Sequence, residues 1–415
     1  MHMADNADES RSELLPFNSA WPMVAKLINP LPSEHAVLFE AVGRILKTDS
    51  VAAWDLPMAD NSAMDGFALR SADTETPAQL RLLAGDAYAG SGSPPPVAPG
   101  TAVPIGTGGL IPPDADAVLP KEHARREGDF VVALQPARLG DHVRRMGEEL
   151  QAGEVLVPAG EGLDPLRIAA LAAAGVTEVE VSRRPKVRVL TSGTEVVPAG
   201  TPIRPGQVVD SNGPLLRLWI DRLLGTPPTA APPLADSAPN LRNAFADALA
   251  GADLLIVTGG VSVGDRDLVK QVLEEDLGVE RVFWRVAQKP GKPTYAGRRG
   301  DTWVLGLPGN PAAVAAMWHV LVRPLLLALM GAGTAQPPRL PVRLATEVRP
   351  NKYRTHLRWC RTDWRDGEVW AEALGRSGSH MLSSFAQADL LAIIPPGGEI
   401  LAAGTQVEGV ELGHG

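Results

Sequence analysis

The chain has 415 residues, of which 45% are hydrophobic and 21% are charged, and its formal net charge is −9. A chain of this length exceeds one ordinary hydrophobic core, so we expect about two to four domains. The acidic balance provides no broad basic surface, which argues against nucleic acid as a partner. The single cysteine, Cys360, excludes an intrachain disulfide and a multi-cysteine metal site.

Two stretches of the sequence bear on where the protein resides. Residues 1–13 are polar and acidic, and they lack the apolar stretch of a signal peptide. The longest apolar run extends from Ala312 to Met330, and His319, Arg323 and Pro324 interrupt it. We therefore expect a buried helix rather than a membrane span, no membrane contact, and a cytoplasmic location.

The first half of the chain changes its pattern twice. Residues 14–53 carry apolar side chains at helical spacing. The helical domain resumes within residues 141–184, where Leu166–Gly175 is the clearest helix and Thr177–Val181 alternates like a strand. Between them, residues 54–140 contain short β runs separated by many prolines and glycines. We therefore predict a discontinuous helical domain (14–53 and 141–184) with a β-rich domain (54–140) inserted in it. The residues at helical spacing in the first segment are Val24, Leu27, Ile28, Leu38, Val42 and Ile45.

The second half contains the clearest alternation of strand and helix patterns. Residues 185–334 alternate apolar runs of strand length with segments of helical periodicity. This alternation predicts an α/β domain with a doubly wound, mostly parallel sheet and helices on both faces. After a proline-containing linker, residues 339–412 return to short β runs, so the predicted fold class is multidomain α/β. The strand-like runs of the α/β domain are Val187–Leu190 and Asp253–Val257, and its helical segments are Pro214–Leu224 and Leu241–Leu249.

Three glycine loops lie at the ends of apolar runs in the α/β domain. They are Thr191–Glu195, Thr258–Asp265 and Leu307–Pro311. Because the carboxyl ends of parallel strands meet at one edge of a sheet, we expect these loops to lie together and to bind a ligand. Backbone N–H groups in such loops favour an anion. The loops do not match a Walker A motif, so hydrolysis of a nucleoside triphosphate is not indicated.

Capping and polar residues accompany these loops. Asn310 suits the N-cap of a helix and Pro311 suits its first position. The positive end of that helix would then point at Gly309, although an ordinary capped helix start explains the same residues. Ser262 can donate a hydrogen bond to a ligand. Asp265 could cap the following helix or hold Mg²⁺ beside phosphate groups.

Four charged residues are further candidates for a site. Lys289 and Lys292 flank Pro290-Gly291, a turn that could direct both ammonium groups at one anion. The alternative is a pair of solvated surface lysines. Asp60 and Asp65 lie in a short polar loop that opens the β-rich segment. These carboxylates could supply a general base or a metal ligand, or they could form only Asx turns.

Hydroxyl groups occur in two further segments of small residues. Thr107 precedes two glycines, where its hydroxyl could bind phosphate. Ser379 and Ser383 could act as neutral donors to an oxyanion, whereas His380 between them is more often structural. Arg354 is a candidate partner for that oxyanion, because a guanidinium binds tetrahedral oxyanions with fork geometry.

Taken together, these segments resemble the molybdopterin molybdotransferase family, which includes MoeA and the gephyrin E domain. The resemblance runs from about residue 15 to residue 411, and the motifs occur in the family's order. Each motif is weak alone, but the ordered set is highly specific. The matching segments are Asp60–Arg70, Thr107-Gly108, Gly147-Glu148, Asp210–Asn212, Gly259–Asp265, Lys289–Pro293, Gly306–Pro311 and Ser379–Ser384.

The resemblance implies an architecture and a reaction. The family forms an elongated homodimer of four-domain chains: a discontinuous domain, an inserted domain, a molybdopterin-binding α/β domain and a β-barrel-like C-terminal domain. Its members take adenylylated molybdopterin and molybdate, release AMP with the help of Mg²⁺, and produce molybdenum cofactor. The active cleft combines the third and fourth domains of one chain with the second domain of its partner. Transient contact with carrier or acceptor proteins for the cofactor is also implied.

The resemblance further implies the roles of individual residues. The implied catalytic residues are Asp60, Asp65, Lys289 and Lys292, of which the lysines are molybdate ligands. The implied Mg²⁺ ligands are Asp210 and Asp265. The implied substrate-binding residues are Thr107, Ser192, Gly193, Asn212, Gly259, Gly260, Ser262, Pro308, Gly309, Asn310, Arg354, Ser379 and Ser383.

The chain departs from the family pattern at several positions. Gly147-Glu148-Glu149 replaces the frequent Gly-Glu-Asp, and Thr194 stands where the family's loop carries an acid. These differences leave room for a paralogue with altered specificity or rate, and tungstate stays open as a substrate. Two alternative functions are a molybdopterin adenylyltransferase-like enzyme, whose fold resembles residues 186–331 alone, and a non-enzymatic molybdopterin-binding scaffold.

Overall fold

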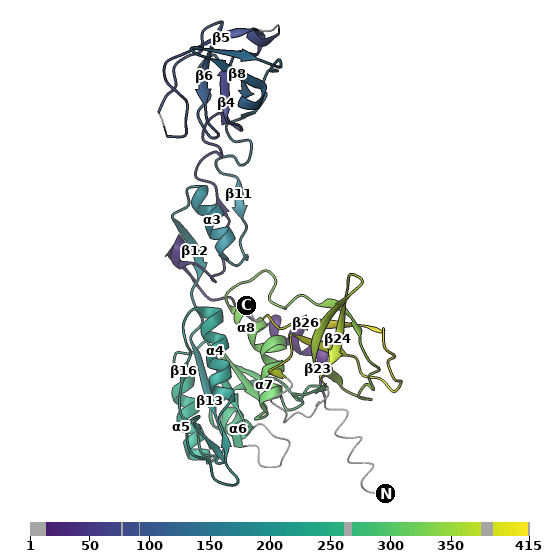
Figure 1. The fold of residues 1–415 in the computed structure, drawn as a ribbon. Helices are drawn as coiled ribbons and strands as arrows, with labels where there is room; N and C mark the ends of the chain where they lie inside the picture. Colours follow the sequence, from purple (N-terminus) through teal and green to yellow (C-terminus); the bar gives the residue numbers. More distant parts are fainter. Residues whose placement is uncertain (1–13, 76–77, 91, 261–267, 375–384, 414–415) are drawn as a thin grey trace.

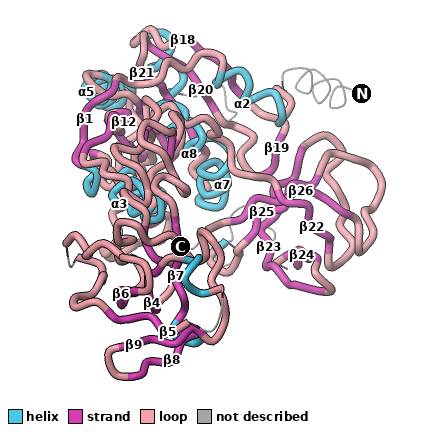
Figure 2. The backbone as a smooth tube through the Cα atoms, turned by 90° about the horizontal axis from the view of Figure 1, so that it is seen from above, coloured by secondary structure: helices cyan, strands magenta, loops and turns pink. Residues whose placement is uncertain are grey.

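The computed structural model describes residues 14–75, 78–90, 92–260, 268–374 and 385–413. The chain is elongated (Figure 1), with a β-rich domain at one end and the α/β domain at the other. A small linker domain connects them, and it is formed by residues 33–62 and 143–182. The C-terminal barrel lies beside the α/β domain in both views (Figures 1 and 2). The predicted multidomain α/β fold class is confirmed.

A six-stranded mixed sheet forms the centre of the α/β domain. Its order is β16-β13-β17-β21-β20-β18, in which the first four strands are parallel and the last two pair antiparallel. The predicted doubly wound, mostly parallel sheet is therefore confirmed. The strands are β13 (Val187–Thr191), β16 (Thr229–Ala230), β17 (Leu254–Thr258), β18 (Glu280–Trp284), β20 (Tyr295–Arg299) and β21 (Thr302–Leu307), with the short parallel pair β14 (Val196–Val197) and β15 (Val208–Val209) nearby.

Helices cover both faces of this sheet, which explains its continuous apolar strands. All five residues of β17 are buried, because Leu254 and Ile256 face one helix layer while Leu255 and Val257 face the other. One layer contains α4 (Asn212–Leu224), α7 (Pro311–Met317), η5 (Trp318–Val322) and α8 (Arg323–Leu329). The other contains α5 (Ala238–Leu249), α6 (Leu268–Gln271) and η4 (Val272–Asp276).

The long apolar helix is a core helix. Residues Pro311–Leu329 are long and apolar enough to cross a membrane, but 72% of that stretch is buried inside the protein. Its middle turn, η5, is π-helical, and the Trp318 ring stacks on Trp219 of α4 with 5.3 Å between the ring centroids. The prediction of a buried helix is therefore confirmed for this part of the chain.

The C-terminal residues form a five-stranded barrel. Its order is β23-β24-β22-β26-β25, and a further pairing of β23 with β25 closes it. Cys360 is buried in the barrel core, and this burial raises the pKa of its thiol to about 12, as expected for a packing residue. The strands are β22 (Leu340–Leu344), β23 (Thr355–Arg365), β24 (Glu368–Ala373), β25 (Leu390–Ile394) and β26 (Gln406–Glu411).

A two-residue strand joins the α/β domain to this barrel. Strand β19 (Gln288–Lys289) leaves the α/β domain and pairs in parallel with β23. The register places Gln288 opposite Thr355 and Lys289 opposite His356. The segment that carries the two candidate lysines is therefore part of the junction between the domains.

The linker domain differs from the helical domain that the sequence predicts. It contains only one α-helix, α3 (Pro165–Ala173), together with three short antiparallel pairs. The prediction of helix around Leu38, Val42 and Ile45 is wrong. Leu38 and Ile45 belong to different hydrophobic clusters and Val42 is 48% exposed, so their spacing does not define one helix face. The pairs are β1 (Ser33–Val37) with β12 (Glu178–Ser182), β2 (Ser50–Val51) with β11 (Val155–Val157), and β3 (Asn61–Ser62) with β10 (Val143–Arg144); η1 (Leu38–Glu40) follows β1.

The first helix belongs with the α/β domain. Helix α2 (Phe17–Ala25) contacts β18 and α8, and Val24 is buried in the core cluster that underlies the central sheet. Just before it, Leu15 forms a parallel bridge with Val286. The beginning of the described chain therefore packs near the lysine segment rather than in the linker domain.

The inserted domain is β-rich, as the sequence predicts. A six-stranded sheet of order β7-β4-β6-β5-β9-β8 surrounds two small apolar clusters. The strands are β4 (Gly66–Leu69), β5 (Gln79–Leu82), β6 (Thr101–Ile105), β7 (Ala117–Pro120), β8 (Ala124–Glu127) and β9 (Phe130–Ala133), with short 3₁₀ turns η2 (Ser71–Thr74) and η3 (Lys121–His123). The acidic loop that contains Asp60 and Asp65 enters this domain.

Candidate functional site

Three adjacent parallel strands end at the same level of the central sheet. Thr191 at the end of β13 is in register with Thr258 of β17, which is in register with Leu307 of β21. The loops that follow line a shared cleft of about 420 Å³. The structure therefore brings together the predicted residues of these loops that it describes. They are Ser192, Gly193, Asn212, Gly259, Gly260, Pro308, Gly309 and Asn310.

Two glycines let these loops approach one another closely. Gly259 has a φ of +86°, and a Cβ atom there would lie 2.3 Å from the carbonyl oxygen of Ser192. Gly260 has a φ of +66°, and its Cβ atom would lie 2.4 Å from a methyl carbon of Val269. Both positions combine a left-handed backbone with no room for a side chain, so only glycine fits without rearrangement.

Unpartnered polar atoms line the cleft. The side-chain oxygens of Ser192, Asn212 and Thr258 are buried and have no hydrogen-bond partner within the described part of the chain. The amide nitrogen of Asn212 donates to the carbonyl oxygen of Gly309 at 2.8 Å, which leaves its oxygen available to accept. Buried polar groups are costly unless they form hydrogen bonds, so these atoms indicate a polar ligand.

Asp210 lies at the start of α4 inside this cleft. One carboxylate oxygen accepts the N–H of Gly213 at 2.9 Å, and the other accepts the hydroxyl of Thr191 at 3.2 Å. Glu195 and Asp236 also line the cleft, although neither was predicted as a site residue. The described residues contain no cluster of three or more His, Cys, Asp or Glu side chains that could hold a metal ion. The donor set therefore fits Mg²⁺ only if a substrate phosphate supplies further oxygens.

The predicted helix start at Asn310 is present. Its side-chain oxygen accepts the N–H of Ala312 at 3.1 Å, and Pro311 occupies the first helical position. Because Gly309 and Asn310 line the cleft, the positive end of this helix lies at the cleft.

The two lysines lie next to this cleft, on the side of the barrel. Pro293 lines the cleft, but neither lysine is among the described residues that do so. Among the described residues, the cleft carries acids, and the cations form a separate neighbouring cluster. Strand β19 causes this separation, because its pairing with β23 holds Lys289 against the barrel.

This cationic cluster spans the junction of the two domains. Burial lowers the pKa of the Lys292 ammonium, and the nearby Arg285 and Arg354 lower it further. Within the described residues, no carboxylate forms an ion pair with Lys289 or Lys292. Two lysines that lie among other cations and form no such ion pair indicate a site for an anion.

One face of β23 extends the cluster. His356 and Arg358 share one face of the strand, and Arg354, directly before its first residue, continues the same alternation. Burial lowers the pKa of His356 to about 4, and Arg358, Lys289 and Arg354 add to the effect. The imidazole is therefore neutral at pH 7. Sequence reasoning identified Arg354 but missed His356 and Arg358, although their spacing of two residues was a usable signal.

Asp65 and Thr107 lie in the distant β-rich domain, and Asp60 lies where the linker domain joins it, so all three are far from the cleft (Figure 1). One oxygen of Asp65 accepts both the N–H and the hydroxyl of Thr107, each at 2.8 Å. Asp60 accepts the N–H of Met146 at 2.8 Å and a guanidinium hydrogen of Arg145 at 2.6 Å.

Hydrogen bonds keep both of these carboxylates ionised. The N–H of Met146 is the largest cause of the lowered pKa of Asp60, and the N–H of Thr107 is the largest cause for Asp65. Permanently charged carboxylates suit cation binding better than proton transfer near neutral pH. The remaining predicted site residues, Ser262, Asp265, Ser379 and Ser383, lie outside the described residues.

The fold and this cleft define a multidomain protein built around a molybdopterin-binding α/β domain. Residues 188–328 match the family model "Probable molybdopterin binding domain". Residues 15–175 match "MoeA N-terminal region (domain I and II)", and residues 341–412 match "MoeA C-terminal region (domain IV)".

Full-length relatives agree with these matches. A molybdopterin molybdenumtransferase of Haemophilus influenzae is 33% identical over 90% of this chain and 92% of that protein. One from a Nostoc species is 34% identical over 95% of this chain and 92% of that protein. The crystal structure of a molybdopterin biosynthesis MoeA protein from Pyrococcus horikoshii superposes with a TM-score of 0.80 at 26% identity, over 96% of this chain and all of that one (100%). The chain belongs to the MoeA family of molybdopterin molybdenumtransferases.

Proposed function

We propose that the protein transfers molybdenum from molybdate to adenylylated molybdopterin and releases AMP. The observation that carries the proposal is the pairing of two adjacent features. A glycine-lined cleft presents unpartnered buried oxygens of Ser192, Asn212 and Thr258 to a polar ligand. Beside it, Lys289, Lys292 and Arg354 form no ion pair with a carboxylate among the described residues.

Each feature suits one substrate. The cleft offers hydroxyl and amide groups, glycine backbone and a helix N-terminus, which together suit a pterin that carries a phosphate group. The cluster of Lys289, Lys292 and Arg354 suits the doubly charged molybdate ion. Two unit negative charges at ~4 Å repel by ~4 kcal/mol at an effective dielectric constant near 20, and adjacent cations offset this repulsion. Positioning and electrostatics would thus supply most of the rate enhancement.

Mg²⁺ would be held by Asp210 together with Asp265 and the phosphates of the substrate. When bound, Mg²⁺ neutralises phosphate charge and so favours cleavage of the phosphoanhydride. Asp210 is oriented for this role, because Gly213 and Thr191 hold its carboxylate at the floor of the cleft. The hydroxyl of Thr191 and the start of α4 therefore position the carboxylate before any ion binds.

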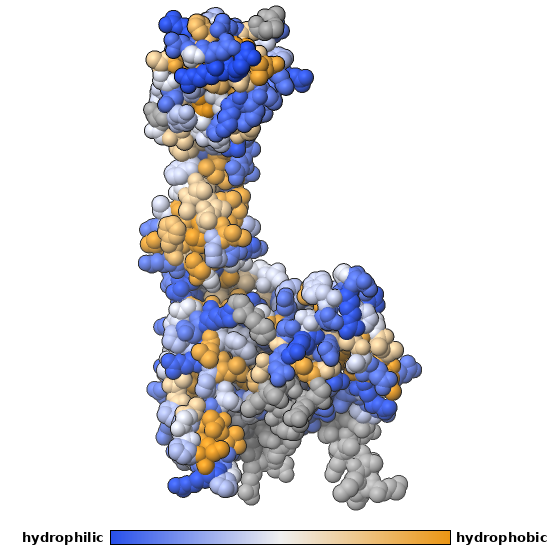
Figure 3. Space-filling view, in the orientation of Figure 1, coloured by the Kyte–Doolittle hydropathy of each residue, from blue (hydrophilic) through white to orange (hydrophobic). Residues whose placement is uncertain are grey.

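A homodimer would complete the site. Asp60 and Asp65 lie at the far end of the chain from the cleft, so a second copy must bring its β-rich domain to the lysines (Figure 1). The linker domain carries an apolar surface suited to this contact (Figure 3), with Leu166 exposed by 82% and Phe39 by 71%. Large exposed apolar patches mark interaction sites. We place the dimer in the cytoplasm, with transient contacts to cofactor carrier or acceptor proteins.

The direct test is release of AMP by the purified full-length protein. Adenylylated molybdopterin is the substrate, and molybdate and Mg²⁺ are each omitted in turn. We expect AMP release only when both are present, with tungstate tested in place of molybdate. AMP release that does not depend on molybdate would contradict the proposal and would favour a different reaction of the pterin.

A double variant separates an enzyme from a binding scaffold. Lys289→Ala with Lys292→Ala should abolish molybdate-dependent turnover and leave pterin binding within about twofold, because the lysines lie outside the glycine cleft. Lys186→Ala, an exposed lysine at the other end of β13, is the control and should change neither quantity. A wild-type protein that binds the pterin tightly without turnover would instead be a scaffold.

A further inference from the structure

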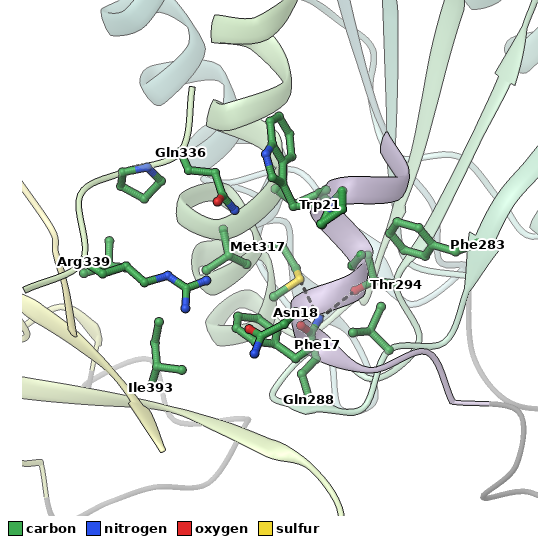
Figure 4. Close-up of a pocket in the computed structure, with 17 residues that line it drawn as sticks. Phe17, Asn18, Trp21, Phe283, Gln288, Thr294, Met317, Gln336, Arg339 and Ile393 are labelled. Carbon is green, nitrogen blue, oxygen red and sulfur yellow. Dashed lines mark hydrogen bonds between the residues drawn. The ribbon is translucent and has the colours of Figure 1, made fainter. Parts of the chain in front are cut away.

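The loop that carries the two lysines is held from beneath by two buried side chains. The carbonyl oxygen of Gly291 accepts a hydrogen bond from the side-chain amide of Gln288 at 2.9 Å and another from the hydroxyl of Thr294 at 2.6 Å. The same amide nitrogen lies 2.9 Å from the sulfur of Met317 on α7 (Figure 4). Gln288 is 3% exposed and Thr294 is 1% exposed.

The backbone of this loop is also closed on itself. The N–H of Val286 donates to the carbonyl oxygen of Lys292 at 2.9 Å. Gly291 has a φ of +95°, and a Cβ atom there would lie 2.8 Å from the amide nitrogen of Gln288 and 3.0 Å from a carbon of Met317. Buried side chains of the α/β domain therefore hold the loop that carries Lys289 and Lys292 through the Gly291 carbonyl.

A cavity shows that packing alone does not hold the loop. About 210 Å³ of free space lies on the core side, lined by Gln288, Thr294 and Met317 together with aromatic side chains such as Trp21 and Phe283 (Figure 4). The loop is therefore not supported by close packing on every side of Gln288 and Thr294. The two hydrogen bonds to Gly291 are the specific contacts that fix its position, and a buried carbonyl that loses its donors is costly to leave unpaired.

Fixing this carbonyl also fixes the backbone on either side of Gly291. The peptide bond between Gly291 and Lys292 is trans, so the N–H of Lys292 points away from Gln288 and Thr294. This N–H has no acceptor among the residues that the structure describes. On the other side of the turn, Lys289 directly follows Gln288 and pairs with His356. Both lysines are thus held by the same two buried side chains, Gln288 and Thr294, which we call the brace.

We propose that Gln288 and Thr294 are positioning residues for the oxyanion: through the Gly291 carbonyl, they aim the ammonium groups of Lys289 and Lys292 and the N–H of Lys292 at molybdate. The proposal rests on the assignment of molybdate to these lysines. It adds that the geometry of the oxyanion site is set by a polar brace in the core, which touches neither substrate.

Substitutions at Thr294 isolate the brace. Thr294→Val keeps the shape of the side chain and removes the donor, whereas Thr294→Ser keeps the donor and removes a methyl group. Gln288→Leu removes the second donor and provides an independent variant if Thr294→Val fails to fold. Thr302→Val is the matched control, because the hydroxyl of Thr302 donates to the carbonyl oxygen of Ala252 at 2.7 Å in the same domain.

The measurements are molybdate and tungstate binding by calorimetry, the KM for molybdate, the KM for adenylylated molybdopterin, and the melting temperature. We expect Thr294→Val and Gln288→Leu to raise the Kd and KM for molybdate about 10-fold or more, since small misplacements of site residues have effects of this size. The KM for the pterin should change by less than about twofold, and Thr294→Ser should restore molybdate affinity. Thr302→Val should lower the melting temperature without changing either KM.

Several outcomes would overturn the proposal. Unchanged molybdate affinity in both Thr294→Val and Gln288→Leu would show that the brace does not position the lysines. An equal rise in both KM values, or the same rise in Thr302→Val, would show only a general loss of stability. If Lys292→Ala abolishes molybdate binding while the brace variants bind normally, the positioning role fails and the proposed function stands. A wild-type protein that binds no oxyanion would refute both.

Discussion

Replacement of Gly259 by alanine tests whether the close contact of two strand-end loops builds the pterin cleft. A Cβ atom at this position would lie 2.3 Å from the carbonyl oxygen of Ser192, and the φ of Gly259 is +86°. The left-handed backbone costs a residue with a Cβ atom about 1–2 kcal/mol. The clash is with backbone, so no rotamer change relieves it, and moving two loops apart adds about 1–3 kcal/mol. We expect Gly259→Ala to lower the free energy of unfolding by about 3 kcal/mol.

Gly251→Ala provides a matched control. Gly251 precedes β17 in the same domain and has a φ of +82°, but a Cβ atom there would meet nothing within 4 Å. This variant therefore carries the backbone cost of about 1–2 kcal/mol without the clash. The difference between the two variants measures the contact between the loops.

Chemical denaturation followed by tryptophan fluorescence gives the stabilities, and calorimetry gives the affinity for the pterin. Gly259→Ala should also bind the pterin at least about tenfold more weakly, because separated loops move Ser192 and Thr258 away from the ligand. Gly251→Ala should bind the pterin normally. Equal losses of stability in the two variants, together with normal pterin binding in both, would refute the reasoning that the loops form the cleft by direct contact.

Four further variants test the scaffold of the site. Asn310→Ala and Asp164→Ala each remove a helix N-cap and should each cost about 1 kcal/mol of stability, but only Asn310→Ala should weaken pterin binding, as calorimetry would show. The guanidinium of Arg183 forms two hydrogen bonds of 2.6 and 2.7 Å with Asp253. Asp253→Ala leaves this guanidinium without its partner and should lower the stability in urea denaturation by about 3 kcal/mol. A loss of stability below about 0.5 kcal/mol would contradict this. Because the pKa of His356 falls from 6.5 to about 4 on folding, the unfolded chain binds the extra proton, and wild-type stability should decline by roughly 3 kcal/mol as the pH falls from 6.5 to 4. In thermal melts, His356→Leu should lose less stability than the wild type between pH 6.5 and pH 4. An equal loss of stability in the variant and the wild type would contradict the assignment.

The cleft could be predicted from sequence because its signals are local. An apolar run followed by glycine marks the end of each of β13, β17 and β21, and the topology of a parallel sheet then places the three ends together. Asn310 and Pro311 likewise indicate a helix start, because asparagine suits the N-cap and proline suits the first helical position. Local patterns of this kind need no knowledge of the rest of the fold.

The cationic cluster could be predicted only in part: Lys289, Lys292 and Arg354 are recognisable in the sequence, but the contact that joins their segments is not. Strand β19 has only two residues and pairs with β23, which lies more than sixty residues further along the chain, so no periodic pattern reveals the contact. The spacing of Arg354, His356 and Arg358 is visible in the sequence, but only this register places His356 opposite Lys289. The brace formed by Gln288 and Thr294 is equally hidden, because its shared acceptor is a backbone carbonyl.

The position of the acidic loop leads to a prediction about assembly. Within one chain, Asp65 and Lys292 lie at opposite ends of the molecule (Figure 1), so an active site that needs both must combine two chains. In a symmetric dimer, one chain with Asp65→Asn and one with Lys292→Ala would together form one intact site and one doubly damaged site. Heterodimers isolated with two affinity tags should therefore show about half of the wild-type turnover, although each variant homodimer is inactive.

The complementary heterodimer distinguishes shared sites from sites within one chain. A wild-type chain paired with a chain that carries both Asp65→Asn and Lys292→Ala has one damaged group in each shared site. It should be inactive if sites are shared, whereas sites contained within one chain would leave about half of the wild-type turnover. The two heterodimers contain the same substitutions in the same number, so differences in stability cancel. Activity in the second heterodimer and not in the first would exclude a shared site. Because Asp65 lies far from Lys292 within one chain (Figure 1), the acidic loop would then affect turnover only indirectly.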